Sequence, residues 1–269
     1  MLVSSDGTKI EVEWPEPDGR PGVFVFAFHK SGSVLLEGLC RALCEKAGRS
    51  RVNAEGILFN KGFHIEQFEA DLANQLPVEG IVNGVYRTML DGLTLGRFNR
   101  ARFVVLIRNP LDAIVSYYFS ILKSHYVPKS GDVHNTLSAA RSQLAATSLN
   151  SALVSGQFDY VFANMARFGR LIKSPIARDL RLYRYEDVIY DKRRWVRLLA
   201  ADLDTPVDQG FVDQLLPAFD VFPDKEDDSK HVRQVRPGDY LRKLDRSTII
   251  HLVEKHAEVF KGLGYKIPL

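Results

Sequence analysis

Short uncharged apolar runs alternate along the chain with longer stretches in which apolar residues recur at helical spacing. The first run, residues 23–28, contains only Val, Phe and Ala, which is typical of a strand buried on both faces of a parallel sheet. A polar turn follows at 29–33. Apolar side chains then recur every three or four residues from Leu36 to Ala47, before Gly48. This spacing predicts an amphipathic helix that ends at the glycine.

The same periodicities predict the elements of the remaining chain. Residues 1–22 are expected to be peripheral, with a turn at Asp6-Gly7 and an edge strand at 9–14. No internal repeat is visible. Further strands are predicted at 51–59, 80–86, 103–107 and 180–184, and helices at 64–76, 111–122, 137–153, 158–172, 191–203 and 245–261.

The composition is that of an ordinary globular protein. Of the 269 residues, 45% are hydrophobic and 26% are charged, which is enough for a single domain, 1–269, with one large core. The net charge of +3 is compatible with an anionic cofactor. It is too small to indicate a nucleic-acid partner, and none is expected.

Cysteine usage and hydropathy bear on the compartment. Cys40 and Cys44 are the only cysteines, and both lie on the apolar side of the first predicted helix, so we expect buried free thiols in a reducing environment. The N-terminus lacks a basic segment followed by an apolar core, and no run approaches eighteen apolar residues. Neither a signal peptide nor a membrane span is expected, and a cytoplasmic location is predicted.

The turn after the first strand has the composition of an anion-binding loop. The first turn of the following helix has free N–H groups at the positive end of the helix dipole. Lys30 adds a full charge, and Ser31 and Ser33 add hydroxyl donors. This is not a Walker loop, because Lys30 precedes Gly32 instead of following a glycine. The alternative is an ordinary surface lysine on a connecting loop.

A cation ends the strand predicted at 103–107. Arg108 is followed by Asn-Pro at 109–110, which suits the start of a helix, and Ser116 lies eight residues after the arginine. A metal-dependent nucleotide kinase would need a carboxylate here to hold Mg²⁺, whereas a cation suits direct phosphate binding. The alternatives are a salt bridge from Arg108 to Asp112 and an ordinary helical role for Ser116.

Both stretches resemble segments of the sulfotransferases that use 3′-phosphoadenosine 5′-phosphosulfate (PAPS). Lys-Ser-Gly-Ser at 30–33 resembles their 5′-phosphosulfate loop. Arg-Asn-Pro-x-Asp-x-x-x-Ser-Tyr-Tyr at 108–118 resembles their 3′-phosphate segment, in which the arginine and the serine hold the 3′-phosphate. Tyr-Glu-Asp at 185–187 resembles a third landmark, whose tyrosine lies near the adenine.

A fourth landmark matches in part. Gly238-Asp239, preceded by basic residues, resembles the Arg-Lys-Gly-x-x-Gly-Asp-Trp segment that closes over the 3′-phosphate in this family. Arg233 falls on its first arginine, but Gln-Val at 234–235 replaces Lys-Gly and Tyr240 replaces Trp. Arg236 is expected to compensate for the lost lysine. The alternative is a merely solvated basic loop.

The resemblance covers roughly residues 23–265. It implies an α/β fold in which helices flank a mainly parallel sheet, and a P-loop-like site at the carboxyl ends of the strands. It implies sulfuryl transfer from PAPS to a hydroxyl or amine, with 3′,5′-adenosine bisphosphate (PAP) as product and no metal. Residues 120–179 would cover the acceptor, and 224–242 would form a mobile cofactor-closing loop. The implied cofactor-binding residues are Lys30, Ser31, Gly32, Ser33, Val34, Arg108, Ser116, Tyr185, Arg233 and Arg236, with Lys30 also catalytic.

The base that would accept the acceptor's proton is left open. Many cytosolic members carry a histidine base upstream of the strand-end arginine, where this chain has Tyr-Arg at 86–87. Glu55 ranks first here, since its distance from the loop lysine approximates that of a glutamate base in some carbohydrate sulfotransferases. His64, at a helix start, ranks second, and His29, beside the loop lysine, third. Each could instead be an ordinary core or surface residue. Leu35 also replaces the family's adenine-stacking Trp.

Two other functions remain open. A non-catalytic module that binds PAPS or PAP needs the phosphate site but no base, which fits the missing histidine. A P-loop nucleotide kinase is disfavoured by the absence of a Walker loop. For an enzyme, the expected acceptor is a metabolite, a carbohydrate or a lipid.

Overall fold

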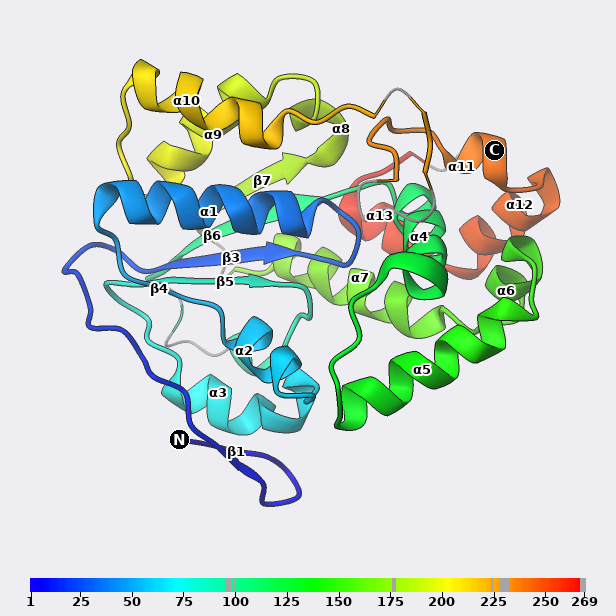
Figure 1. The fold of residues 1–269 in the computed structure, drawn as a ribbon, viewed down its shortest axis with the longest axis horizontal. Coiled ribbons are helices and arrows are strands. Elements are labelled where there is room, and N and C mark those ends of the chain that lie inside the picture. The colour runs from blue at the N-terminus through cyan, green and yellow to red at the C-terminus, as the bar shows by residue number, and fades with distance from the viewer. Residues whose placement is uncertain (95–97, 99, 176–177, 224, 228–232, 267–269) are drawn as a thin grey trace.

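A five-stranded parallel sheet forms the centre of this computed structural model, which describes residues 1–94, 98, 100–175, 178–223, 225–227 and 233–266 (Figure 1). The strand order is β4-β5-β3-β6-β7, and each neighbouring pair is parallel. The α/β fold expected from the sequence is confirmed. The strands are β3 (Val23–Ala27), β4 (Arg51–Val52), β5 (Val82–Tyr86), β6 (Arg102–Ile107) and β7 (Leu180–Arg184).

Helices connect the strands and cover both faces of the sheet. Two short 3₁₀ helices, a π-helix at Ser120–Ser124 and an antiparallel hairpin of β1 (Leu2–Val3) and β2 (Lys9–Ile10) complete the described elements. The α-helices are α1 (Ser33–Ala47), α2 (Ala54–Asn60), α3 (Glu69–Gln75), α4 (Pro110–Phe119), α5 (Asp132–Ala145), α6 (Leu149–Val154), α7 (Asp159–Lys173), α8 (Tyr185–Val188), α9 (Lys192–Asp202), α10 (Gln209–Phe219), α11 (Tyr240–Lys243), α12 (Arg246–Lys255) and α13 (Ala257–Leu263).

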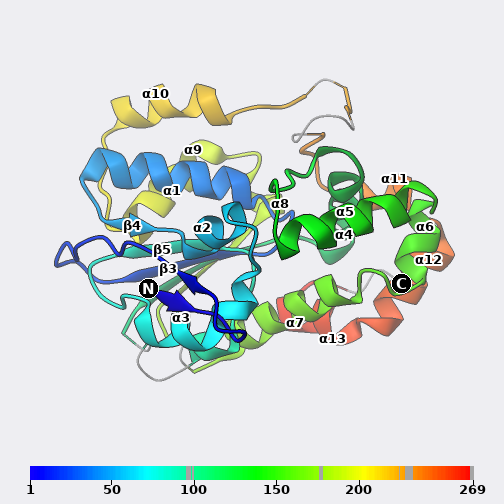
Figure 2. The ribbon, with the colours of Figure 1, turned by 60° about the horizontal axis from the view of Figure 1, so that its bottom comes forward.

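The sheet separates two hydrophobic cores, because side chains alternate between its faces along each strand. In β3 the odd-numbered residues, Val23 to Ala27, belong to the core shared with α1, α9 and α10. The even-numbered Phe24 and Phe26 belong to the core on the opposite face, which α3, α7 and α13 cover (Figure 2). This double burial explains why the run carries no charge.

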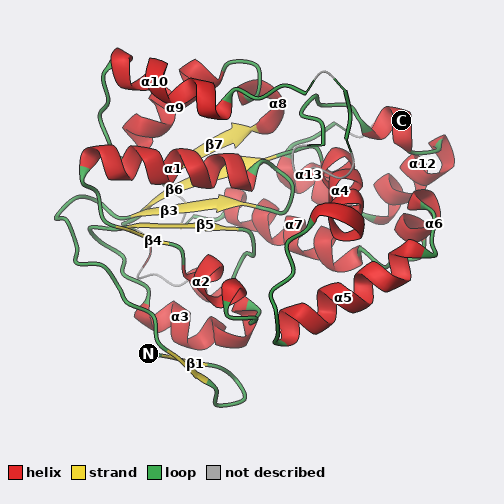
Figure 3. Cartoon of the chain, in the orientation of Figure 1, coloured by secondary structure: helices red, strands yellow, loops and turns green. Residues whose placement is uncertain are grey.

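The carboxyl ends of β3, β6 and β7 point to the same edge of the sheet (Figure 3). Each of these strands runs within a few residues into a helix, α1, α4 or α8 respectively. The two stretches predicted to bind anions and the Tyr-Glu-Asp landmark therefore meet at one edge, as expected for a ligand site in a parallel α/β sheet.

The first helix ends as predicted. Gly48 follows α1 with a φ of 58°, and its backbone N–H bonds to carbonyls of the last turn. This left-handed conformation favours glycine. Cys40 and Cys44, both on α1, are buried free thiols, as expected.

Some predicted element bounds are wrong for identifiable reasons. The strand predicted at 51–59 ends after two residues, because Asn53 caps α2 by accepting the backbone N–H of Gly56. The helix predicted at 137–153 is interrupted before Ser148, which caps α6 in the same way. The final helix breaks at His256, which ends α12 and stacks on Phe162 with ring centroids 3.9 Å apart.

The N-terminal segment contributes to the core. Its hairpin pairs only Leu2–Val3 with Lys9–Ile10, so the edge strand predicted at 9–14 is shorter and lies outside the central sheet. Leu2 and Val12 are nonetheless buried in the core beside α3. No helix among the described residues is both long and apolar enough to cross a membrane.

A close helix contact provides a test of the packing. Gly169 on α7 is buried, and a Cβ there would lie 3.1 Å from the backbone of Gly262 on α13. We expect Gly169→Leu to lower the free energy of unfolding by about 2–3 kcal/mol, because overpacking separates the two helices. Gly210→Leu, at an exposed position of α10, is the control in urea denaturation and should cost less than half as much. Equal losses would contradict the packing argument.

Candidate functional site

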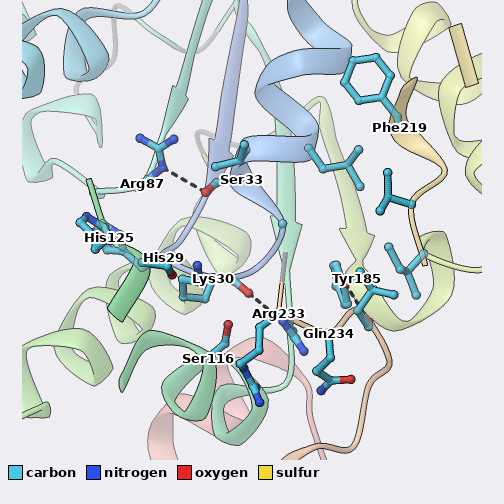
Figure 4. A pocket seen from close by; sticks show the side chains of 18 of the residues that line it. His29, Lys30, Ser33, Arg87, Ser116, His125, Tyr185, Phe219, Arg233 and Gln234 are labelled. Atoms are coloured by element: carbon cyan, nitrogen blue, oxygen red, sulfur yellow. Dashed lines mark hydrogen bonds between the residues drawn. The ribbon is translucent and has the colours of Figure 1, made fainter. Parts of the chain in front are cut away.

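A cavity of about 660 Å³ opens at the carboxyl ends of the strands (Figure 4). Its wall comes from the loop after β3, the start of α1, the ends of β5 and β6, and the segment after α10. Residues distant in the sequence therefore share one pocket. Among the residues named from the sequence, the wall includes His29, Lys30, Gly32, Ser33, Val34, Glu55, Arg108, Ser116, Tyr185 and Arg233.

The loop between β3 and α1 is tightly wound. Lys30 has a φ of 66° and Gly32 a φ of 98°, both in the left-handed region. A Cβ at Gly32 would also lie 3.0 Å from the ring of Tyr185, so both conformation and space require glycine. The hydroxyl of Ser31 donates to the carbonyl of Phe28 at 2.7 Å. Ser31 therefore braces the loop from within and lies outside the cavity wall.

The start of α1 is open to the cavity. Its N-cap residue, Gly32, provides no side chain to bond the free N–H groups of the first turn. Such groups bind anions readily, and the helix dipole adds to the attraction. Ser33 and Val34, the first two residues of this turn, line the cavity.

Five cationic side chains line the same cavity: Lys30, Arg87, Arg108, Lys192 and Arg233. Burial, together with the positive charges of the three arginines, lowers the pKa of Lys30 to about 8. The ammonium group of Lys30 donates to the hydroxyl of Ser120 at 3.3 Å. This density of positive charge is suited to a ligand with several negative charges.

Arg108 is buried, and not all of its N–H donors are used in hydrogen bonds to the described residues. One terminal nitrogen donates to the carbonyl of Lys30 at 3.1 Å, and the guanidinium lies 4.4 Å from the ring centroid of Tyr185. Its Nε has no hydrogen-bond partner among the described residues. The alternative of a salt bridge to Asp112 is wrong, because the Asp112 carboxylate instead accepts the backbone N–H groups of Gly238 and Tyr240.

The predicted closing segment reaches the cavity in part. Arg233 lines it, forms ion pairs with Glu226 and Asp239, and lies 4.6 Å from the ring centroid of Phe119. The hydroxyl of Tyr185 donates to the carbonyl of Val235 at 2.8 Å. Arg236 is exposed and outside the cavity wall. Residues 224 and 228–232 of the predicted loop lie outside the described residues.

One end of the cavity is mainly apolar. Sequence analysis did not identify its residues, apart from Leu35, because they come from α8, α10 and the segment after α10. The pattern of α10 predicts an apolar face but not that its last turn reaches a ligand site. The apolar residues at this end are Leu35, Ile189, Ala218, Phe219 and Val221.

Glu55 lies in the first turn of α2 and faces the cavity from the other end. Its carboxylate accepts the backbone N–H groups of Arg87 and Thr88 and the hydroxyl of Thr88 at 3.0 Å. Burial raises the pKa of Glu55 to about 7, against the lowering effect of Arg87 and of these hydrogen bonds. A carboxyl group in this range can accept a proton near neutral pH.

The two histidine candidates occupy different places. His64 lies outside the cavity wall, where it caps a 3₁₀ turn and its Nε2 lies 3.4 Å from the hydroxyl of Thr136. His29 lines the cavity, but burial and the positive charge of Arg87 lower its pKa to about 3. His29 is therefore a neutral imidazole at physiological pH.

The structure adds wall residues that the sequence did not indicate. Arg87, directly after β5, donates through Nε to the hydroxyl of Ser33 at 3.0 Å (Figure 4). His125 follows the π-helix, and its Nδ1 lies 3.3 Å from the hydroxyl of Ser120. Phe59 and Tyr126 lie near it. The position of Arg87 directly after a predicted strand could have identified it as a wall residue. The π-helical turn that places His125 has no recognisable sequence pattern.

The raised pKa of Glu55 predicts a pH-dependent stability. Between pH 4.5 and 7 the folded state binds more protons at Glu55 than the unfolded state does, so the contribution of Glu55 to the free energy of unfolding should fall as the pH rises, whereas that of His29 rises up to its ordinary pKa of 6.5. The difference between a pKa of 4.5 in the unfolded state and about 7 in the folded state corresponds to a change of about 3 kcal/mol in the free energy of unfolding. Glu55→Gln should lose this part of the dependence in urea denaturation at pH 4.5 and 7.5. The exposed control Glu13→Gln should retain it, and parallel curves for Glu55→Gln and wild type would contradict the assignment.

No protein-family model matches the sequence, and the comparison with curated proteins gives no match. Solved structures are similar in fold. Mouse sulfotransferase SULT7A1 complexed with PAP has a TM-score of 0.58 at 14% sequence identity, covering 91% of this chain and 87% of that chain. Retinol dehydratase in a complex with retinol and PAP has a TM-score of 0.51 at 14% identity, covering 95% of this chain and 85% of that chain. The chain therefore has the fold of the sulfotransferases.

Proposed function

We propose that the protein transfers a sulfuryl group from PAPS to a hydroxyl or amine of an acceptor. The observation that carries the proposal is a single cavity that combines an open helix start, five cations and a carboxyl group with a pKa of about 7. The fold supports the same conclusion, since proteins of this fold have been solved with PAP.

The cationic and apolar parts of the wall are suited to the anionic groups and the adenine of PAPS. The start of α1 and Lys30 would hold the 5′-phosphosulfate. Arg108 and Ser116 would hold the 3′-phosphate together with Arg233, and the buried Nε of Arg108 has no protein partner among the described residues. The apolar end beside Tyr185 would accommodate the adenine. PAPS, when bound, supplies the activated sulfuryl group.

Each residue near the reacting centre would have a defined task. Lys30 and the N–H groups at the start of α1 would stabilise the negative charge that develops on the leaving phosphate, since preorganised donors act most strongly on developing charge. The carboxylate of Glu55 would accept the proton of the acceptor's hydroxyl. His29, held neutral by its low pKa, would contribute a hydrogen bond without adding charge.

The end of the cavity near Glu55, where the acceptor would bind, is lined by polar and aromatic side chains. Glu55, Arg87 and His125 lie there with the rings of Phe59 and Tyr126. An acceptor made of hydrocarbon apart from its hydroxyl would displace water from these polar groups without replacing the water's hydrogen bonds, which is costly. A hydroxylated metabolite or carbohydrate is therefore favoured over an apolar lipid. A cytoplasmic location remains part of the proposal.

Incubation with ³⁵S-labelled PAPS tests the function directly. Labelled product should form with one or more members of a panel of sugars, phenols and amines, and EDTA should leave the rate unchanged. Tight PAP binding without transfer to any acceptor would favour the non-catalytic nucleotide-binding module. Activity abolished by EDTA and restored by Mg²⁺, with ATP as donor, would favour a kinase.

Lys30→Ala should reduce turnover at least ~10²-fold, by analogy with the loss of one preorganised donor. The chain provides a matched control, because Lys129-Ser-Gly repeats the triplet at an exposed position away from the cavity. Lys129→Ala should turn over at the wild-type rate. Both variants should keep the wild-type circular dichroism spectrum, and a folded, fully active Lys30→Ala protein would refute the role of the loop.

Glu55→Gln should lower kcat by ~10²-fold or more and leave the Kd for PAP almost unchanged, because a base acts on the acceptor. The wild-type rate should rise with pH through about 7, where Glu55 loses its proton. A histidine base would give a similar limb, so substitution is the decisive measurement. His64→Ala should retain wild-type kcat; the opposite pattern would reassign the base to His64.

A further inference from the structure

A buried carboxylate lies between the two residues proposed to hold the 3′-phosphate. Asp112 is on α4, four residues after Arg108 and four before Ser116. Asp112 and Ser116 both lie on α4, and at this spacing they share one face of the helix. The Asp112 side chain is only 1% exposed, and burying a carboxylate requires strong compensating hydrogen bonds.

The compensating bonds come from the predicted closing segment, more than a hundred residues away. The two carboxylate oxygens of Asp112 accept the backbone N–H of Gly238 at 2.7 Å and that of Tyr240 at 3.1 Å. Gly238 has a φ of 89°, a conformation that favours glycine. Charge-assisted bonds to backbone N–H groups are stronger than neutral ones. Asp112 therefore fastens this segment to α4.

The fastened segment carries Arg233. Between Gly238 and Tyr240 lies Asp239, which is 2% exposed and pairs with Arg233 on one side and with Arg242 at 2.8 Å on the other. The position of the Arg233 guanidinium thus depends on backbone that Asp112 holds.

Arg236 does not provide the compensation expected from the sequence. It is exposed and lies outside the cavity wall. The Lys-Gly pair of the family segment is absent, so this chain has fewer direct means of closing over a 3′-phosphate. The link from α4 supplies an indirect one.

We propose that Asp112 is a positioning residue that holds residues 233–240 over the 3′-phosphate site and so sets the preference for nucleotides with a 3′-phosphate. This inference rests on the proposed function, because it assumes that the cavity binds such a nucleotide. Asparagine cannot replace Asp112, since its NH₂ group would face one of the two backbone N–H groups and leave that N–H without an acceptor.

Calorimetric titration with PAP and with adenosine 5′-monophosphate separates the two phosphate sites. Asp112→Asn should raise the Kd for PAP roughly 10- to 100-fold, as expected for the loss of a charge-assisted bond, and leave that for the monophosphate within about threefold. Asp208→Asn is the matched control, because Asp208 likewise accepts a backbone N–H, that of Phe211 at 2.8 Å, but at the exposed start of α10. It should change neither Kd.

Hydrogen exchange distinguishes positioning from direct contact. Amide exchange within 233–240 should accelerate in Asp112→Asn but not in Arg108→Ala, although both variants lose the preference for PAP. An equal loss of affinity for both nucleotides, or an unchanged preference, would overturn the role of Asp112. A measurement on the wild-type protein gives a further test. If the amides of Gly238 and Tyr240 exchanged there at the rate of an unstructured peptide, the role of Asp112 would also be overturned.

The same titrations distinguish a failure of this proposal from a failure of the proposed function. If the wild-type protein bound PAP no better than the monophosphate, the nucleotide assignment would fail before Asp112 was considered. If it preferred PAP and Asp112→Asn preferred it equally, only the positioning role would fail.

Discussion

The site depends on an accumulation of positive charge that the protein neutralises only in part. Lys30, Arg87 and Arg108 line one cavity and hydrogen-bond to hydroxyls or carbonyls, with no ion pair among the described residues. Of the other two cations of the wall, Arg233 pairs with Glu226 and Asp239, and Lys192 pairs with Asp220. Burial and the repulsion among these charges together lower the pKa of Lys30 to about 8. Residues at and near the strand ends hold the cations together, and a polyanionic ligand would relieve their repulsion.

Arg87 links the two ends of this cavity. Its Nε bonds to Ser33 of the anion-binding loop, and its charge opposes the effect of burial on Glu55. Without that charge the pKa of the Glu55 carboxyl group would be raised still further above its ordinary value. The backbone N–H of Arg87 also bonds to Glu55. A single residue at the end of β5 thus couples the electrostatics of the anion site to the proton affinity of the proposed base.

The sequence was sufficient for the parts whose signal is local. The run at 23–28, the loop with Lys30 and Gly32, and the strand that ends in Arg108 each carry their own pattern, and the parallel sheet confirms their common edge. Other parts depend on contacts that no local pattern encodes. The pKa of Glu55 reflects its burial, and the link from Asp112 joins segments more than a hundred residues apart.

The apolar end of the cavity receives an aromatic ring from outside the predicted motif. Leu35 stands where the family has an aromatic ring, but Phe219 on α10 reaches the same wall. It does so because α10 packs directly on α1 at Gly38, where a Cβ would lie 2.5 Å from the Phe219 ring. Any larger residue at Gly38 would push α10 away and withdraw the ring. The glycine that permits the contact and the aromatic residue that uses it are far apart in the sequence. The wall can therefore be recognised only in the folded chain.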